Sequence, residues 1–87
     1  MNLAAVIAIL SVLLRLLQIL FIARFVAQLL DASGSNPITR LLVDITEPIL
    51  APVRRILPSF GGLDFSPMVV LLLLVVLQRV LVNIAVS

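Results

Sequence analysis

From Leu3 to Leu30 the chain reads LAAVIAILSVLLRLLQILFIARFVAQLL. Only five polar side chains interrupt this stretch: Ser11, Arg15, Gln18, Arg24 and Gln28. As a helix it would be about 42 Å long, and about 20 apolar residues are enough to cross a bilayer. It has neither the basic start nor the small-residue cleavage site of a secretory signal. We therefore predict a retained transmembrane helix over residues 1–30.

A second apolar stretch, FSPMVVLLLLVVLQRVLVNIAV, runs from Phe65 to Val86. Ser66 is a favourable N-cap, and Pro67 suits the first position of a helix. This helix would be about 33 Å long, which is again sufficient to cross a bilayer. We predict a second transmembrane helix over residues 65–87. The fold class is then an all-α membrane protein, a two-span transmembrane helical hairpin.

The composition supports this assignment and excludes several functions. Of 87 residues, 63% are hydrophobic and only 11% are charged, whereas soluble domains carry about 25% charged residues. The chain has no Cys and no His, so thiolate chemistry, disulfides and the commonest metal ligand are missing. A net charge of +2 is too small to indicate nucleic-acid binding. We expect no enzymatic activity, no cofactor and no metal site.

Residues 31–64, between the two apolar stretches, hold all four acids, half of the arginines and four of the five prolines. Asn36 and Pro37 have the types of an N-cap and a first helical residue, and apolar residues follow at helical spacing. Pro48 should end or kink this helix.

A second short amphipathic stretch follows Pro48 and ends before Pro58. We predict proline-bounded helices over about 37–47 and 48–57 that form an amphipathic connector in the membrane interface. The alternative is a connector that is amphipathic without lying in the interface.

Two arginines within the spans come to nearly the same depth. If Leu30 and Phe65 are level in an antiparallel hairpin, Arg15 and Arg79 lie close to one level, where the spans contain no acid. They would meet anionic lipid headgroups or an acid on a partner subunit. Alternatively, each side chain extends independently to the membrane surface.

Arg24 lies nearer the connector than Arg15 does. Three acids are candidates to pair with it: Asp31, Glu47 and Asp64. We expect a structural ion pair that holds the connector against the hairpin.

Signals for catalysis are weak. Asp44 and Glu47 are three residues apart on one predicted helix and could form an acid/base pair, but no further ligand or nucleophile accompanies them. A solvated polar face is the favoured interpretation. Gly61 and Gly62 lack the surroundings of a phosphate-binding loop, so a turn is expected there.

The connector and the start of the second span carry a recognisable string, in which TEPILAPVRRILP occupies residues 46–58. Together with GGLDFSP at 61–67 and Asn36-Pro37, it resembles the signature of the YggT family, also called YlmG. This sequence holds one copy of a module that some members carry twice. The motif residues are Asn36, Pro37, Thr46, Glu47, Pro48, Pro52, Pro58, Gly62, Ser66 and Pro67.

The resemblance implies a small integral membrane protein without an established enzymatic activity. Members of the family have been linked to cell division, to the assembly of cytochrome haem in photosynthetic membranes and to osmotic tolerance. The implied location is the inner (plasma) membrane or a thylakoid-type membrane.

Two functional hypotheses follow. The first is a scaffold or assembly factor, a homo-oligomer or a subunit of a larger membrane complex. Its connector arginines, Arg40, Arg54 and Arg55, would bind anionic headgroups or an acidic protein surface, each contact contributing about 1 kcal/mol. They also favour a cytoplasmic connector. The second is a subunit of an oligomeric channel or transporter, whose path would be lined by Arg15, Gln18, Gln78, Arg79 and Asn83.

Overall fold

Three helices form the part of the chain that the computed structural model describes, residues 2–57 and 65–86. They are α1 (Leu3–Leu30), α2 (Pro37–Ile56) and α3 (Ser66–Val86). These ranges contain no strand. The prediction of an all-helical fold with two candidate membrane spans is confirmed.

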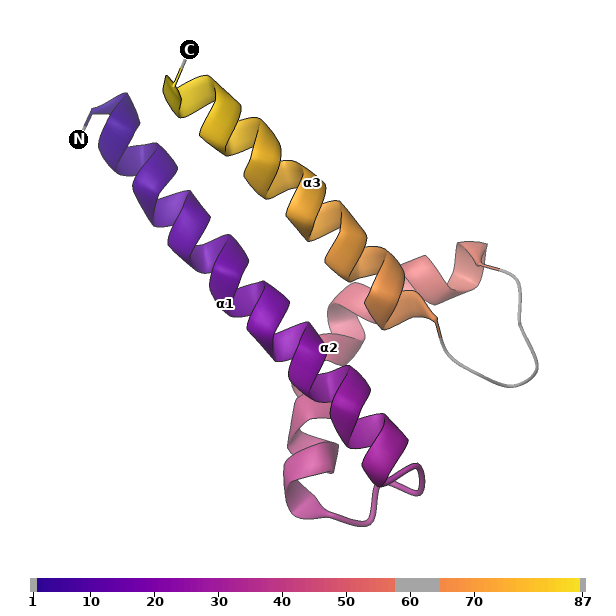
Figure 1. The fold of residues 1–87 in the computed structure, drawn as a ribbon. Coiled ribbons are helices and arrows are strands. Elements are labelled where there is room, and N and C mark those ends of the chain that lie inside the picture. Colours follow the sequence, from indigo (N-terminus) through magenta and orange to yellow (C-terminus); the bar gives the residue numbers. More distant parts are fainter. Residues whose placement is uncertain (1, 58–64, 87) are drawn as a thin grey trace.

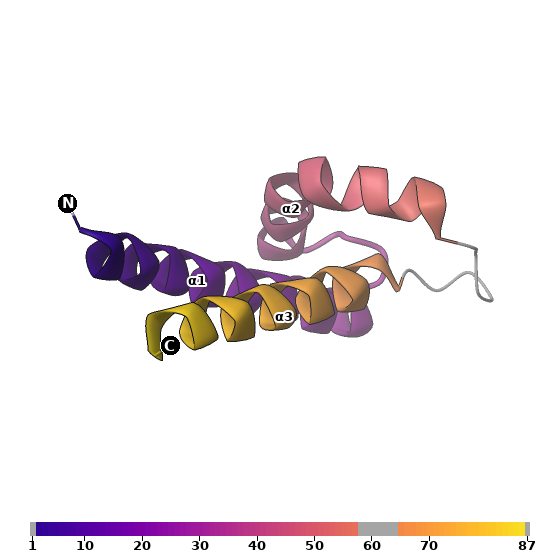
Figure 2. The same cartoon turned by 90° about the horizontal axis from the view of Figure 1, so that it is seen from above.

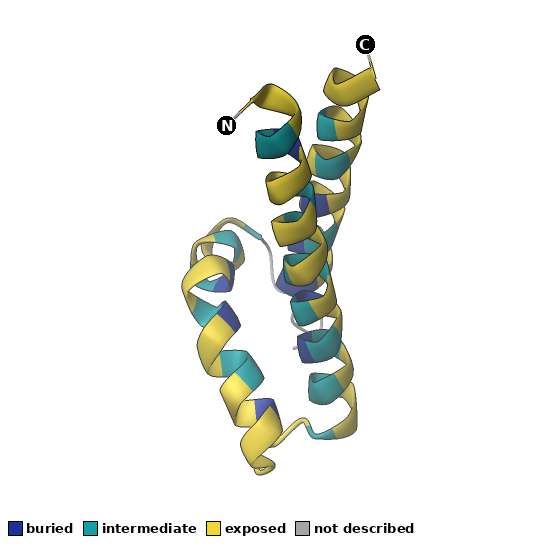
Figure 3. Ribbon diagram, turned by 90° about the vertical axis from the view of Figure 1, so that its left-hand side faces the viewer, coloured by how far each residue is buried: buried dark blue, intermediate teal, exposed yellow. Residues whose placement is uncertain are grey.

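The helices α1 and α3 lie side by side in opposite directions, with both chain termini at one end and α2 at the other (Figure 1). Both are long and apolar enough to cross a membrane. Only 11% of the most apolar part of each helix is buried, whereas a core helix of a soluble protein would be mostly buried. The exposed faces extend along both helices (Figure 3). Lipid or other chains must therefore cover these faces.

Each helix begins with local hydrogen bonds that its sequence supplies. The side chain of Asn2 accepts a hydrogen bond from the Ala5 amide, and the side chain of Asn36 accepts one from the Ile38 amide, both at 2.8 Å. At α3, the amides of Met68 and Val69 donate to the Phe65 carbonyl. The helix therefore starts one residue earlier than expected from Ser66 as N-cap, and Pro67 lies in the first turn, where no amide is needed.

The connector helix α2 is continuous but strongly bent, so its two arms run in different directions (Figures 1 and 2). One helix thus spans the residues for which two helices, over about 37–47 and 48–57, were predicted; we refer to its residues 37–47 and 48–56 as the first and second arm. Pro48 and Pro52 lie inside the helix, and each removes one backbone hydrogen bond and crowds the preceding turn. The hydroxyl of Thr46 also donates to the Leu42 carbonyl at 2.7 Å, a bond that often bends helices.

The small apolar core lies where the three helices meet. Phe21 from α1 and Leu50 from α2 are fully buried, and they pack with Val70 and Leu74 from α3. The second arm of α2 therefore contacts the hairpin through Leu50. This packing holds α2 near the connector end of the two long helices.

Candidate functional site

The most buried charged group in the described structure is the guanidinium of Arg24, near the end of α1. Its side chain is only 2% exposed. It donates to Thr46 Oγ1 at 2.5 Å and to the Val43 carbonyl at 3.4 Å, both on α2. It also lies 3.3 Å from Glu47 Oε2, and its Nε donates to Gln28 one turn further along α1. A buried arginine needs such a set of acceptors, because an unpaired charge is costly to bury.

Thr46 connects this arginine to the backbone of α2. Its hydroxyl accepts from Arg24 and donates to the Leu42 carbonyl. The residue is fully buried. From the sequence, Thr46 was identified only as a residue of the family motif. Its position directly before Glu47, a candidate partner of Arg24, was the only feature of the sequence that pointed to this site. That position did not predict the contact between Thr46 and Arg24.

Glu47 lies between two arginines. Its Oε1 accepts from Arg54 at 2.6 Å, and its Oε2 faces Arg24. The hydrogen bond from Arg54 lowers the pKa of Glu47, and the positive charges of Arg54 and Arg24 lower it further, against the opposing effect of partial burial. Glu47 is therefore ionised at neutral pH and joins α1 to the second arm of α2.

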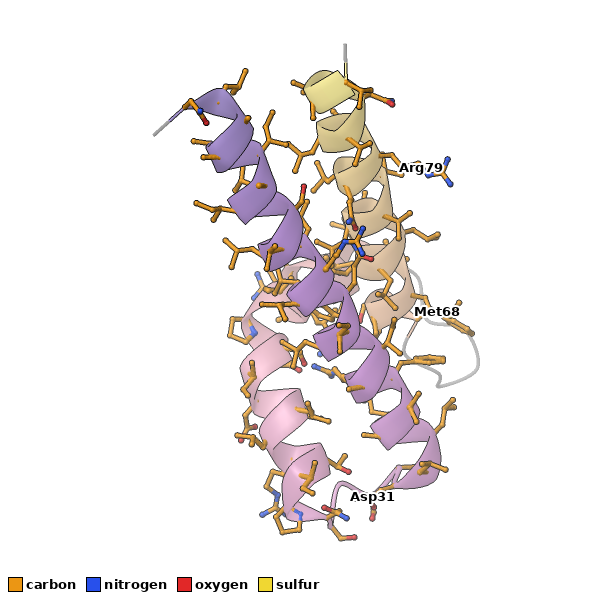
Figure 4. The ribbon with its side chains drawn as sticks, turned by 60° about the vertical axis from the view of Figure 1, so that its left-hand side comes forward. Asp31, Met68 and Arg79 are labelled. Atoms are coloured by element: carbon orange, nitrogen blue, oxygen red, sulfur yellow. The ribbon has the colours of Figure 1, made fainter. Side chains whose placement is uncertain are left out.

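Of the three acids considered for Arg24, the structure brings Glu47 to it. Asp31 instead organises the turn between α1 and α2, where Figure 4 labels it. Its carboxylate accepts from the Asn36 amide at 2.8 Å and from the hydroxyls of Ser33 and Ser35. The bond from the Asn36 amide is the main reason that the pKa of Asp31 is lowered. Gly34 takes a φ of +70° in this turn, which suits a residue without a Cβ.

Several other predicted residues can be placed, and three cannot. Asn36 and Pro37 begin α2, and Ser66 and Pro67 are buried at the start of α3. Pro58, Gly62 and Asp64 lie outside the described residues, as does the turn expected at Gly61-Gly62.

The connector helix α2 has three distinct sides. One side, with Thr39, Thr46 and Leu50, is buried against the hairpin. A second, exposed side carries large apolar residues at helical spacing: Ile38, Leu41, Ile45, Ile49 and Ile56. The remaining side carries charges: Arg40, Asp44, Glu47, Arg54 and Arg55. Beside the side that packs on the hairpin, α2 thus has one apolar and one charged face, as helices that lie in a membrane interface do.

A second group of polar side chains lies between α1 and α3, near the middle of the hairpin. The Gln18 side chain donates to that of Gln78 at 2.5 Å. These two glutamines line a groove of about 570 Å³ together with Arg15, Arg79 and Asn83. Arg15 and Arg79, which were predicted to lie at nearly the same depth, both line this groove. The hydrogen bond between Gln18 and Gln78 was not predicted.

Among the described residues, the group around Arg24 contains one carboxylate, that of Glu47, and the groove between α1 and α3 is lined by none. In the ranges 2–57 and 65–86, no cluster of three or more His, Cys, Asp or Glu side chains could hold a metal ion. The guanidinium of Arg24 is engaged with acceptors on all sides. What this arrangement does chemically is to join helices.

Comparison with known proteins gives a family match over nearly the whole chain. The family model described as CCB3/YggT matches residues 3–85. The chain is 47% identical over 47 residues to the uncharacterized protein YggT of Escherichia coli K12, an alignment that covers 54% of this chain and 25% of that protein. It is 34% identical over 84 residues to an uncharacterized protein of Haemophilus influenzae, covering 94% of this chain and 46% of that protein.

A third relative is an uncharacterized protein of Pseudomonas aeruginosa, 40% identical over 70 residues, with 80% of this chain and 36% of that protein covered. The chain thus spans a quarter to a half of the length of these relatives. No solved structure matches the chain.

Proposed function

The chain belongs to the CCB3/YggT family, and on that premise we propose that it is a small, non-enzymatic membrane scaffold or assembly factor. In this role α1 and α3 anchor the chain, and α2 presents a recognition surface at the membrane interface. The observation that carries the proposal is the burial of Arg24 against Thr46 and Glu47, which fixes α2 to the hairpin. A simple flexible connector would not need a buried arginine to hold it.

The charged side of α2 supports a role in recognition. Arg40 and Arg55 are exposed there, and Arg54 is exposed while it also binds Glu47. Guanidinium groups bind phosphates and carboxylates through paired hydrogen bonds. The partners are then anionic headgroups or an acidic protein surface, and the exposed apolar faces of α1 and α3 favour a homo-oligomer or a larger membrane complex.

The location belongs to the same proposal. Arginines in a short connector favour its retention on the cytoplasmic side. The chain would lie in the inner (plasma) membrane or a thylakoid-type membrane, with both ends of the hairpin on the opposite side.

The test compares the proteins that co-purify with the chain in mild detergent, identified by mass spectrometry. Arg24→Gln should release α2, and Arg40→Glu combined with Arg55→Glu should reverse the charge of its surface. Both variants should lose partners that the unchanged chain retains. Leu3→Ala, exposed at the other end of the same helix as Arg24, is the control. An identical set of partners in all four samples would contradict the scaffold role.

One observation favours a second function. The groove that holds Arg15, Gln18, Gln78, Arg79 and Asn83 contains the polar residues that would line an anion-attracting path. Two spans cannot enclose a pore, so this function requires an oligomer. Ion flux in proteoliposomes that Arg79→Ala abolishes would support the channel; proteoliposomes without flux would exclude it.

A further inference from the structure

The groove between α1 and α3 contains two cations and no anion. Gln18 and Gln78 are half-buried and joined by their hydrogen bond, while Arg15 and Arg79 are exposed beside them. Figure 4 shows that the Arg79 side chain extends sideways from α3, away from α1. The hairpin therefore satisfies the two glutamines but leaves both guanidinium groups turned to its surroundings.

The depth of these arginines makes a counter-charge necessary. From Ser66 to Arg79 the helix rises about 20 Å, and from Arg79 to Val86 about 10 Å. Since α3 is about as long as the hydrocarbon layer is thick, Arg79 lies roughly 5 Å from the centre of the bilayer. Arg15 is about 18 Å from Leu3, also well inside the layer. Charged side chains at such depths pair with other groups and mark functional contacts.

Lipid headgroups are poorly placed to supply this charge. The phosphates lie outside the hydrocarbon layer, more than about 15 Å from its centre. Helical side chains lean toward the N-terminus of their own helix. Figure 4 agrees that the Arg79 side chain does not extend toward the nearer membrane surface, which lies at the C-terminal end of α3; it extends sideways.

A second copy of this chain cannot supply the charge either. All four acids lie within residues 31–64, outside both spans. A copy inserted in either orientation would therefore bring no carboxylate to the level of Arg15 and Arg79. The missing anion must come from outside residues 1–87.

We propose that the groove between α1 and α3 is the docking site of a transmembrane helix that lies outside this sequence and carries an aspartate or glutamate near its middle. The carboxylate binds Arg15 and Arg79, whose guanidinium groups can each donate two hydrogen bonds. The amide groups of the glutamine pair provide further polar contacts beside it. Close packing and such polar contacts are what drive helix association inside membranes.

This inference deepens the scaffold proposal by naming the chemistry of an intramembrane partner, and it rests on that proposal. It uses α1 and α3, whereas the recognition surface of α2 uses Arg40 and Arg55. Binding measured at one site does not depend on the other, so either proposal can fail alone.

The test uses a synthetic leucine–alanine transmembrane peptide with one central glutamate, labelled with an energy-transfer acceptor. The full chain carries the donor at Ala32→Cys, in the exposed turn before α2, and both are placed in phosphatidylcholine vesicles. The unchanged groove should bind this peptide at least about tenfold more tightly than the same peptide with a central glutamine. Arg15→Gln combined with Arg79→Gln should remove the preference. Arg55→Gln, on α2, should retain it.

Two further measurements keep the outcome clear. Circular dichroism establishes that the double variant is folded. The variant Arg79→Lys, which keeps the charge but not the paired donors, should retain a smaller preference for the glutamate peptide. Equal binding of the two peptides would overturn the proposal, and so would a preference that survives the double variant. Loss of the preference when phosphatidylglycerol is added would show that a headgroup occupies the groove, and would also overturn it.

Discussion

The Oγ1 atom of Thr46 lies 2.5 Å from the guanidinium of Arg24, although the two residues are on different helices. The same hydroxyl donates to the Leu42 carbonyl inside α2. Its single hydrogen is thereby used within α2, and its oxygen remains free to accept from Arg24. One side chain thus links the bend of α2 to the buried charge of α1.

Replacement of Thr46 by valine should weaken the docking of α2. Valine has the same shape but no acceptor, so Arg24 would lose its shortest hydrogen bond at a cost of about 1–3 kcal/mol. The stability of the detergent-solubilised chain can be followed by thermal unfolding. Thr46→Ser keeps the hydroxyl and is the matched control. A Thr46→Val variant as stable as the unchanged chain would contradict the prediction, because it would show that the hydrogen bond to Arg24 contributes nothing to the docking of α2.

Acid should loosen α2 through Glu47. The folded-state pKa of this carboxyl lies below its ordinary value of 4.5, because Arg54 and Arg24 stabilise the ionised form. Its contribution to stability is therefore fully present above about pH 4.5 and is lost as the pH falls through the lowered pKa. Spin labels on α1 and α2 should report a longer distance at low pH.

Asp31 has a lowered pKa as well, so the measurement needs a background in which it does not titrate. In Asp31→Asn, the remaining acid-induced change should be assigned to Glu47. The further variant Glu47→Gln should then show little dependence on pH. A change of the same size in both backgrounds would assign the effect to another group.

Pro48 should control the bend of α2. Alanine restores the missing amide and removes the ring that crowds the preceding turn. The chain has no Cys, so labels can be attached at Ile38→Cys and Ile56→Cys, both exposed on α2. In a straight helix these positions are about 27 Å apart, and Pro48→Ala should lengthen the distance toward that value. Pro37→Ala, at the first helical position, should leave it unchanged. A distance unaffected by Pro48→Ala would assign the bend to Pro52 or to the contacts of Arg24.

The glutamine pair should show strong coupling between α1 and α3. Gln18→Leu alone leaves the Gln78 amide without its partner inside the membrane, at a cost of about 0.6–2 kcal/mol. Gln78→Leu should cost a similar amount. The double variant should be more stable than the sum of the two losses predicts, because no amide is left unpaired. Strictly additive losses would show that the hydrogen bond contributes nothing to association of the two helices.

The long helices could be predicted from sequence because each is a single uninterrupted pattern. Residues 3–30 and 66–86 are apolar over lengths that only a membrane helix needs, and the family string in 46–58 identified the family. These predictions depend on local composition and on spacing along the chain. They do not require knowledge of how distant segments meet.

The acid that pairs with Arg24 could not be predicted from local composition and spacing. Asp31 and Glu47 were both plausible partners, and the choice between them depends on the path of α2. The Asp31 carboxylate is engaged by the turn next to it, and the bend of α2 brings Glu47 back to α1. The pairing of Gln18 with Gln78 likewise depends on the register of α1 against α3. Composition does not determine that register.

The unequal lengths of α1 and α3 have a consequence for α2. Helix α1 is 28 residues long and α3 is 21 residues long, and α1 extends past the start of α3 at the end where α2 lies (Figure 1). Arg24 lies in the last two turns of α1, close to this extension. In a membrane that α1 and α3 span, the extra turns of α1 would set the distance of α2 from the middle of the bilayer. The thickness of that membrane would then decide whether α2 lies level with the headgroups.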